Sequence, residues 1–276
     1  MFNDKRRIAI ISYHSISHDS NRYIITPETF TSQMEFIREN YQIIRLNRIR
    51  DAFFDGEKDA TKIIITFDDG FKNFFEFAYP TLKKLSIPST IFIPTGFIGS
   101  SNLWDMHKNF YTKINIMNSK QLLALSQECL VDFGSHTVSH LSMRNLCAEK
   151  MMREAVDSKK KLEDLFGFGI NMFAYPYGQL DDISGETTRT LLDAGYEIAV
   201  TSRWGTLQSL NGMLKLKRIF FKEKDSYDDL RTKIEGQYDW FAFKERIGFT
   251  FRFGRKQFKV QELQKRVKGL KNMIWF

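Results

Sequence analysis

Short apolar runs rich in β-branched residues alternate with helix-type segments through the first 235 residues of this chain. The runs lie at 8–13, 41–46, 62–67, 89–94, 129–134, 171–175, 196–201 and 214–221. A strand followed by a helix, repeated seven or eight times, is typical of a parallel sheet in the α/β class. At this length we predict a closed or nearly closed (β/α) barrel, and an open doubly wound sheet is the alternative.

Two of the helices have clear boundary signals. Thr26 is suited to cap a helix whose first turn contains Pro27, because proline fits the first helical position. A longer helix is expected over 148–166, and Gly167 should end it.

The excess positive charge is confined to one end of the sequence. Residues 241–276 contain ten Lys and Arg against two acidic residues, whereas 1–240 is balanced with 31 of each. The same stretch holds eight aromatic residues. We therefore divide the chain into a main domain, 1–240, and a short basic aromatic C-terminal extension, 241–276. Interleaved basic and aromatic side chains suit an anionic amphipathic surface, so the extension predicts contact with the inner leaflet of a membrane.

Other uses of the extension remain open. Its aromatic side chains could pack on the main domain while the Lys and Arg keep it soluble. Nucleic acid is not an expected partner, because the neutral main domain offers no basic stripe for phosphates.

Composition excludes several classes of protein. With 42% hydrophobic and 27% charged residues, the chain has the profile of a folded globular protein. Its two cysteines, Cys129 and Cys147, do not form a disulfide framework or a CxxC zinc motif. The apolar stretch 8–11 is too short for a signal peptide, and no run approaches the ~18 apolar residues of a membrane span. We expect a cytoplasmic protein, peripheral at the inner membrane face if the extension binds there.

Unusual polar residues follow the predicted strands. His14 comes after the first strand, Asp68 and Asp69 follow 62–67, and His136 follows 129–134. The segment 176–178 follows another strand. Because the carboxyl ends of barrel strands converge on one mouth, these residues should line one cavity.

His136 and His140 have a spacing that suits a metal site. Four residues apart, they would point the same way from one helical turn. Two imidazoles and one carboxylate form a catalytic ligand set for zinc or a similar divalent ion.

Asp68 and Asp69 can divide two tasks between them. Adjacent side chains diverge as they leave a strand, so one carboxylate can bind an ion while its neighbour takes a proton from water. Followed by Gly70, the pair could also be a plain turn, but its position after an apolar strand, taken together with the histidine pair, favours chemistry.

Three segments together resemble the first motifs of a known family. They are TFDDG at 66–70, SHTVSH at 135–140 and FAYPYG at 173–178. Their order and spacing are similar to those of the polysaccharide deacetylases, the NodB-homology group also called carbohydrate esterase family 4. The resemblance spans roughly residues 8–220. It implies a distorted (β/α) barrel of seven or eight strands, one divalent metal ion, usually zinc, and hydrolysis of the N-acetyl group of a sugar.

The resemblance also implies roles for individual residues. Asp69, His136 and His140 would bind the metal, and Asp68 would be the general base. The segment FAYPYG would bind the acetate and polarise its carbonyl. Its predicted substrate-binding residues are Tyr175, Pro176, Tyr177 and Gly178.

Two residues expected from the family pattern are missing. Ala174 stands where many relatives have an arginine that orients the base, and no histidine follows His140 to act as the general acid. The segment YHSI at 13–16 is similar to one in the branch that acts on poly-N-acetylglucosamine, in which the first-strand histidine supplies the acid. We therefore predict that His14 protonates the leaving amine and that Arg218 replaces the arginine, keeping Asp68 ionised.

Two tryptophans are candidates for the walls of a sugar cleft. Trp104 lies in the loop after 89–94, and Trp204 follows the strand 196–201. Aromatic faces suit the apolar side of a sugar ring.

The function predicted from these residues is metal-dependent hydrolysis of an N-acetylated sugar, with release of acetate. The sugar would belong to a polysaccharide or to a lipid-linked or nucleotide-linked glycan. Two alternatives are a hydrolase of another small amide or cyclic imide with the same metal site, and a relative that binds carbohydrate without turnover.

Overall fold

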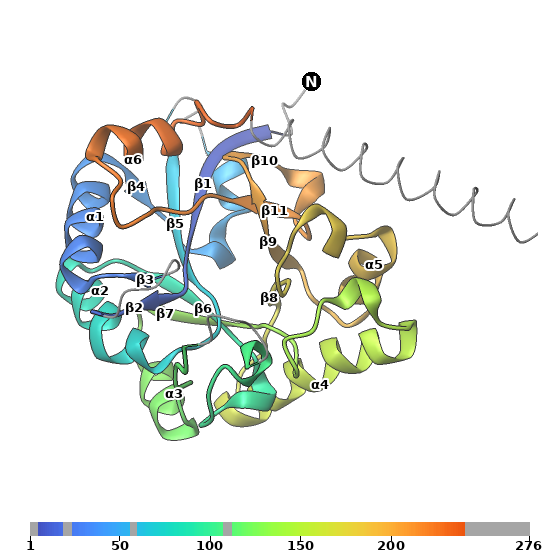
Figure 1. Ribbon diagram of the computed structural model, residues 1–276. Helices are drawn as coiled ribbons and strands as arrows, with labels where there is room; N and C mark the ends of the chain where they lie inside the picture. Colours follow the sequence, from blue (N-terminus) through green and yellow to red (C-terminus); the bar gives the residue numbers. More distant parts are fainter. Residues whose placement is uncertain (1–4, 19–23, 56–59, 107–111, 241–276) are drawn as a thin grey trace, which may run out of the picture. The chain divides into compact units, whose positions relative to one another are not determined.

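Parallel strands form the centre of the fold. The computed structural model describes residues 5–18, 24–55, 60–106 and 112–240. Within these residues the main sheet has the order β10-β1-β5-β6-β7-β8-β9-β11, with β4 paired to β5 (Figure 1). Its seven parallel neighbours are β1 (Lys5–Tyr13), β5 (Lys62–Phe67), β6 (Ser89–Ile93), β7 (Val131–Ser135), β8 (Met172–Ala174), β9 (Ile198–Trp204) and β11 (Leu216–Arg218). The remaining strands are β2 (Ser15–Ile16), β3 (Ile24–Ile25), β4 (Gln42–Ile43) and β10 (Leu207–Ser209).

The two ends of the parallel row meet. Ile219, directly after β11, forms a parallel bridge with Ile11 of β1. The N–H of Ser12 donates to the Ile219 carbonyl at 2.9 Å, and the N–H of Ile219 donates to Ile10 at the same distance. The sheet therefore closes into a barrel, distorted because β8 and β11 contribute only three residues each. The predicted distorted (β/α) barrel is confirmed, and the open doubly wound alternative is wrong.

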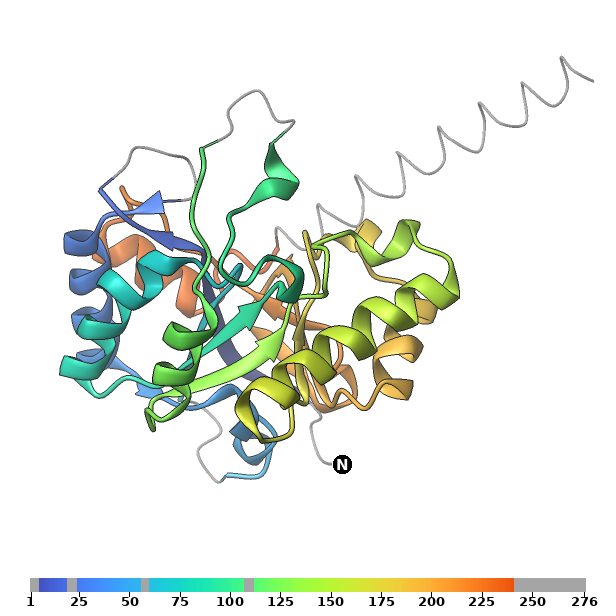
Figure 2. The same ribbon diagram turned by 90° about the horizontal axis from the view of Figure 1, so that it is seen from below.

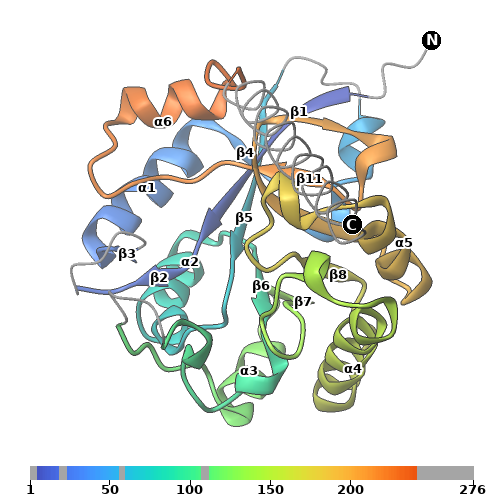
Figure 3. The same ribbon diagram turned by 45° about the vertical axis from the view of Figure 1, so that its right-hand side comes forward.

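Helices surround the barrel on its outside (Figure 1). They are α1 (Pro27–Asn40), α2 (Tyr79–Leu85), α3 (Ser119–Ser126), α4 (Ala148–Phe166), α5 (Gly185–Asp193) and α6 (Tyr227–Ile234). A π-helical turn, Phe74–Ala78, leads into α2. Short 3-10 turns lie at Leu46–Arg48, Asp51–Phe53, Thr95–Phe97, Leu103–Asp105, Met143–Asn145, Leu180–Asp182 and Leu210–Gly212. The helices α4 and α5 pack side by side, as Figure 3 also shows.

The expected helix boundaries are confirmed. The Thr26 hydroxyl accepts the N–H of Thr29 at 3.3 Å, and Pro27 is the first residue of α1. The helix α4 covers the expected range 148–166 and ends at Gly167, whose φ of 78° favours glycine.

Alternate residues of the strands enter two separate cores. The outer core lies between the barrel and the helices, where Ile63 and Ile65 of β5 join Phe30 of α1. The inner core fills the barrel, where Ile64 joins Leu46 from the turn after β4. The barrel is thus packed rather than hollow, and the polar side chains lie at its mouth.

Two predicted strands have less than half of their expected length. The run 41–46 forms only Gln42–Ile43, because the chain then turns inward and buries Leu46. The run 214–221 forms only Leu216–Arg218, because Ile219 crosses to pair with β1.

Residues up to Asp239 form one structural unit. The predicted extension, 241–276, lies outside the described residues, so its boundary and its contacts stay predictions. In the described part of the chain, no helix has the length and apolar character needed to cross a bilayer.

Candidate active site

Strand alternation directs charged side chains into the barrel mouth. Ile64 of β5 and Leu216 of β11 belong to the inner core. Asp68 and Arg218 lie four and two positions further along, so they project to the same side of the sheet. Both are buried, with side-chain exposures of 3% and 2%. Two charged groups that are 150 residues apart in the sequence therefore meet above the apolar core inside the barrel.

Asp68 and Arg218 form a two-pronged ion pair. Arg218 Nη1 donates to Asp68 Oδ1 at 2.8 Å, and Nη2 donates to Oδ2 at 2.6 Å. The guanidinium is itself held by Thr201, whose carbonyl accepts from Nε at 2.8 Å, and by the Thr66 hydroxyl at 3.3 Å. A parallel pair of this kind fixes the plane of the carboxylate as well as its position.

The ion pair keeps Asp68 ionised. Burial by itself raises the pKa of this carboxyl, but the charge and hydrogen bonds of Arg218 outweigh burial and hold the pKa well below its usual range. Asp68 is therefore a carboxylate at neutral pH.

The neighbouring carboxylate, Asp69, faces two imidazoles instead. Its Oδ1 lies 3.2 Å from Nε2 of His140 and 3.5 Å from Nε2 of His136. All three side chains are buried. Burial raises the pKa of Asp69, but the adjacent histidines, His140 first, outweigh burial and lower the pKa.

These three residues fit a divalent metal ion. Their ligand atoms lie within 4.8 Å of one another. Among the described residues, the buried Asp69 Oδ1 accepts no hydrogen bond of normal geometry despite the two nitrogens beside it. A buried, orphaned carboxylate oxygen is costly, and an ion between the three groups would satisfy it. Two imidazole nitrogens and one carboxylate oxygen are ligands that zinc accepts.

His136 is prepared to act as a ligand through Nε2. Its Nδ1 lies 2.8 Å from the carbonyl of Ala174, and since a carbonyl only accepts, Nδ1 carries the proton. Burial, followed by the charge of His140, lowers the pKa of His136 to about 4. The ring is therefore neutral at pH 7, with the Nε2 lone pair directed toward Asp69.

The loop between the two histidines is not a helical turn. The predicted shared turn is wrong, because residues 136–142 follow β7 without helical structure, and Thr137 and His140 have φ of 64° and 53°. The Thr137 hydroxyl accepts the N–H of His140 at 2.9 Å. The two imidazoles converge because the backbone reverses through left-handed positions, which residues with a Cβ seldom adopt.

Asp69 also has a left-handed backbone. Its φ is 67°, and that of Gly70 is 59°. This reversal directly after β5 sends Asp69 toward the histidines while Asp68 continues the strand direction toward Arg218. Strained positions of this kind are retained where the surroundings hold them, and they gather at functional sites.

His14 lies at the edge of the ion pair. Its Nε2 is 3.8 Å from Asp68 Oδ2, and its side chain is 39% exposed. The predicted acid thus lies next to the predicted base, on the open side of the mouth.

Aromatic rings cover His140. Trp104 stacks on it with ring centroids 4.3 Å apart and planes at 19°, and Tyr177 meets it edge-on at 5.2 Å. Trp104, predicted as a cleft wall, is therefore also a support for an imidazole. The other predicted wall, Trp204, packs edge-to-face on Phe220 at 5.1 Å, and Phe220 is half exposed.

The segment after β8 divides into a buried and an exposed part. Tyr175 is buried, its N–H donates to Val200 at 3.1 Å and its hydroxyl donates to Leu214 at 3.0 Å. It is therefore not positioned to contact a substrate, although it was predicted to. Tyr177 is 44% exposed with φ of 61°, and Pro176 has no N–H. Tyr177 is thus the predicted backbone donor whose position suits the role.

Gly178 allows a close backbone approach. A Cβ there would lie 2.6 Å from the N of Ser202, and the N–H of Ser202 donates to the Gly178 carbonyl at 2.9 Å. Its part in the site is to hold this turn against β9 rather than to present a side chain.

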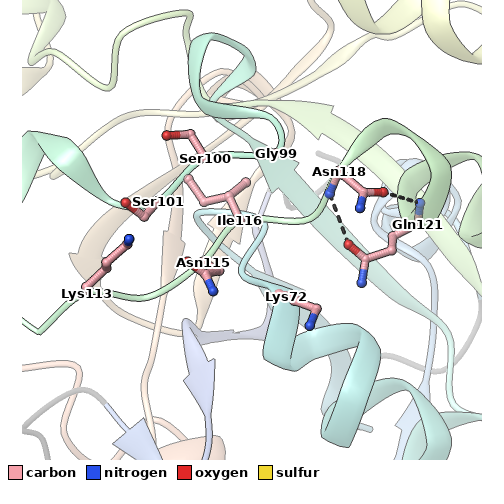
Figure 4. A pocket seen from close by; sticks show the side chains of 9 residues that line it. All are labelled: Lys72, Gly99, Ser100, Ser101, Lys113, Asn115, Ile116, Asn118 and Gln121. Atoms are coloured by element: carbon pink, nitrogen blue, oxygen red, sulfur yellow. Dashed lines mark hydrogen bonds between the residues drawn. The ribbon is translucent and has the colours of Figure 1, made fainter.

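A polar cavity lies outside the candidate site. The segments 98–106 and 112–118 run side by side, as the bridge between Ser101 and Asn115 shows, and they project from the sheet (Figure 2). The cavity, of about 490 Å³, lies against these segments and includes Lys72 and Lys113 (Figure 4). None of the predicted site residues lines it.

A comparison with protein families decides the classification. A model of the family described as polysaccharide deacetylase matches residues 55–199, more than half of the chain.

The chain belongs to the polysaccharide deacetylase family.

Two curated relatives are each 29% identical to this chain over the aligned residues. The protein YxkH of Bacillus subtilis is 29% identical over 215 residues, which are 77% of this chain and 71% of that relative. A poly-beta-1,6-N-acetyl-D-glucosamine N-deacetylase of Staphylococcus epidermidis is 29% identical over 181 residues, 62% of this chain. The match spans 60% of the length of the staphylococcal relative.

Two solved structures have the same barrel fold as this chain. The deacetylase PplD of Streptococcus pyogenes, solved in complex with acetate, has a TM-score of 0.68 at 26% identity over 82% of this chain and 97% of its own. IcaB from Ammonifex degensii has a TM-score of 0.70 at 19% identity, over 84% of this chain and 98% of its own. At 19% identity, the likeness to IcaB shows a shared fold.

Some residues that organise the site were not predicted from the sequence. Thr66 lies within the TFDDG motif, which is a usable signal, but Thr201 and Glu154 carry no local signal. Thr201 supports Arg218, and Glu154 contacts the loop between the histidines. Their partners are more than ten residues away, so only the folded chain reveals them.

Proposed function

We propose that this polysaccharide deacetylase removes the acetyl group from an N-acetylated sugar by metal-dependent hydrolysis. The observation that carries the proposal is the pairing of Asp68 with Arg218 beside the group formed by Asp69, His136 and His140. An ionised carboxylate next to three converging ligands offers a general base beside a metal site, which suits metal-dependent amide hydrolysis at neutral pH.

The metal site would consist of Asp69, His136 and His140. These residues would hold a divalent ion, for which we propose zinc, and the ion would supply the Lewis acidity that polarises an amide carbonyl and makes water more acidic. The neutral state of His136 and the orphaned oxygen of Asp69 support this assignment.

Asp68 is proposed as the general base. Its carboxylate takes the proton of the attacking water, and Arg218 prevents it from rotating or from being protonated before that step. Arg218 would thus take the role of the arginine that is missing at position 174, because it contacts the carboxylate of Asp68 from another strand.

His14 is proposed as the general acid. Its Nε2 lies on the open side of Asp68, where a leaving amine can receive a proton. The backbone N–H of Tyr177 is proposed to donate to the developing oxyanion. Trp104 would border the acetyl group, since it stacks on His140.

The substrate is proposed to be the glycan chain of a polysaccharide, or a lipid-linked or nucleotide-linked saccharide. The staphylococcal relative named for poly-beta-1,6-N-acetyl-D-glucosamine supports a polymer of N-acetylglucosamine as the first compound to test. The cytoplasmic location and the membrane contact stay predictions.

Acetate release tests the proposal. The full chain, loaded with Zn²⁺, should release acetate from β-1,6-linked N-acetylglucosamine oligomers, and a chelator should stop the release. A His14→Ala variant should lose about 10²-fold or more in turnover, the low end of general acid–base contributions, with its zinc content unchanged. Zinc-loaded protein that releases no acetate from any N-acetylated sugar, or that acts only on small amides or cyclic imides, would contradict the proposal.

A further inference from the structure

A buried carboxylate holds the loop that connects the two imidazoles. Glu154 Oε2 accepts the N–H of Val138 at 2.8 Å and the N–H of Ser139 at 2.9 Å. Glu154 Oε1 accepts the hydroxyl of Ser139. Val138 and Ser139 lie between His136 and His140 in the chain, so a single side chain binds the middle of the loop that carries both.

The carboxylate of Glu154 is fixed in place by its helix. Glu154 is 6% exposed and lies on the buried face of α4, together with Met151, Ala155 and Leu162. These neighbours join the outer core, so the helix cannot shift without disturbing the barrel. Glu154 thereby ties the position of the loop to the position of the helix.

Backbone donors stabilise the charge of Glu154. A buried carboxylate is costly unless charged or polar partners satisfy it. In the described part of the chain, no Lys, Arg or His lies within ion-pair distance of Glu154. Two N–H groups and one hydroxyl meet it instead, and hydrogen bonds to a charged acceptor are strong.

The loop needs such an anchor because its backbone is strained. Thr137 and His140 have left-handed φ angles, which are costly for residues with a Cβ and persist only where the surroundings hold them. The 3-10 turn Thr95–Phe97, which follows β6, holds the other side, where the N–H of Gly96 donates to the Val138 carbonyl at 2.8 Å. Val138 is thus held from both sides, with Glu154 on its N–H and Gly96 on its carbonyl.

We propose that Glu154 is a positioning residue for the metal site, setting the separation and direction of the His136 and His140 imidazoles and so the affinity for the ion. This inference rests on the proposed metal-binding role of Asp69, His136 and His140. Glu154 contacts neither ion nor substrate, and its effect passes through Val138 and Ser139. Outer partners of this kind change metal affinity by about 10–100-fold.

The test is zinc affinity of the full chain, measured by competition with a chromophoric chelator. Glu154→Ala should weaken zinc binding by about 10–100-fold. Glu154→Asp keeps the charge but shortens the side chain by one methylene, so it should give an intermediate loss. Glu154→Gln keeps an acceptor oxygen for the two N–H groups and should recover most of the affinity. Glu149→Ala, on the exposed face of the same helix and paired with Arg153, is the matched control and should bind zinc normally.

A spectroscopic measurement separates positioning from simple stabilisation. The Co²⁺-loaded wild type and Glu154→Asp should differ in the visible absorption bands that report ligand geometry, whereas Glu149→Ala should match the wild type. If Glu154→Ala does not fold, Glu154→Asp carries the test with both readouts.

The outcomes distinguish the two proposals. A wild-type chain that binds zinc, with unchanged affinity and spectrum in the folded Glu154 variants, overturns the role of Glu154 and leaves the metal site standing. A wild-type chain that does not bind zinc overturns both.

Discussion

Adjacent carboxylates in this protein have different neighbours and therefore different chemistry. Asp68 is held by a guanidinium, and Asp69 faces two imidazole nitrogens. Two titratable groups with contrasting surroundings are a common basis for dividing catalytic tasks. Here the division follows from one backbone reversal at Asp69.

Exchanging each aspartate for asparagine should separate these tasks. Asp68→Asn should keep zinc affinity within a few-fold but lower turnover by about 10²–10⁴-fold, since it removes a general base. Asp69→Asn removes a proposed metal ligand. It should therefore weaken zinc binding by more than a residue that only supports the ligands, whose loss costs about 10–100-fold. Competition titration and acetate release measure the two effects, and each variant is the control for the other. A fully active Asp68→Asn would exclude it as the base.

Arg218→Met should affect both stability and the pH profile. Removing one partner of a buried pair leaves the other charge uncompensated, which costs about 3–5 kcal/mol. Arg218 lowers the pKa of Asp68, so without it burial raises that pKa. As the pH falls, Asp68 would therefore become protonated at a higher pH in the variant than in the wild type. The acid limb of the kcat/KM profile would move to higher pH.

Urea unfolding and the pH dependence of acetate release measure these changes. Arg189→Met is the control, because Arg189 is exposed and, in the described part of the chain, forms its ion pair with Asp193 on the surface of α5. It should cost at most about 1 kcal/mol. An unmoved acid limb in a folded Arg218→Met variant would show that Arg218 does not set the protonation of Asp68.

At the scale of elements, the strand that leads into the histidine loop packs closely against its two neighbours. Gly134 of β7 lies two residues before His136, and Phe92 of β6 occupies the space that a side chain would need. A Cβ at Gly134 would lie 2.5 Å from the Phe92 ring and 2.9 Å from the Met172 carbonyl. The close approach of β6, β7 and β8 therefore requires glycine at this position.

Gly134→Ala should destabilise the protein by about 1–3 kcal/mol, the usual cost of overpacking, because the Met172 carbonyl belongs to the backbone and cannot move aside. Gly185→Ala is the matched control. A Cβ at Gly185, the first residue of α5, meets nothing within 4 Å, so alanine should be neutral or stabilise by up to about 1 kcal/mol. Urea unfolding of both variants compares them, and equal stabilities would contradict the packing argument.

At the scale of the whole molecule, the excess positive charge and the barrel belong to different parts of the sequence. The part up to residue 240 is electrically balanced, and 241–276 carries the entire excess. Every residue assigned to the candidate site lies within 1–240, so the role of the extension is a separate prediction.

The extension is predicted to bind anionic membranes. The full chain should float with vesicles containing anionic lipid, less at high salt because exposed charges are screened, and a chain that ends at residue 240 should not. Neutral vesicles are the control. Equal flotation of the two chains would refute a membrane role for 241–276.

Much of the barrel and part of the site could be predicted from the sequence. Strand runs and helix boundaries are local signals, set by periodicity and capping within a few residues. The predicted metal ligands follow strand ends, so the topology brings Asp69 and His136 together once the barrel is known. The helical turn assumed for His136 and His140 failed, because spacing alone does not distinguish a helix from a left-handed loop.

The sequence by itself determined the alternation of strands and helices and the chemical identity of the groups at the barrel mouth, because both depend on neighbouring residues. The tertiary structure alone decided the two-pronged geometry of the predicted contact between Arg218 and Asp68, the burial of Tyr175, and the contact of Glu154 with the histidine loop. Such contacts depend on the closure of the barrel and on the packing of α4 against it. They join residues whose separation in the chain carries no periodic signal, so no local pattern encodes them.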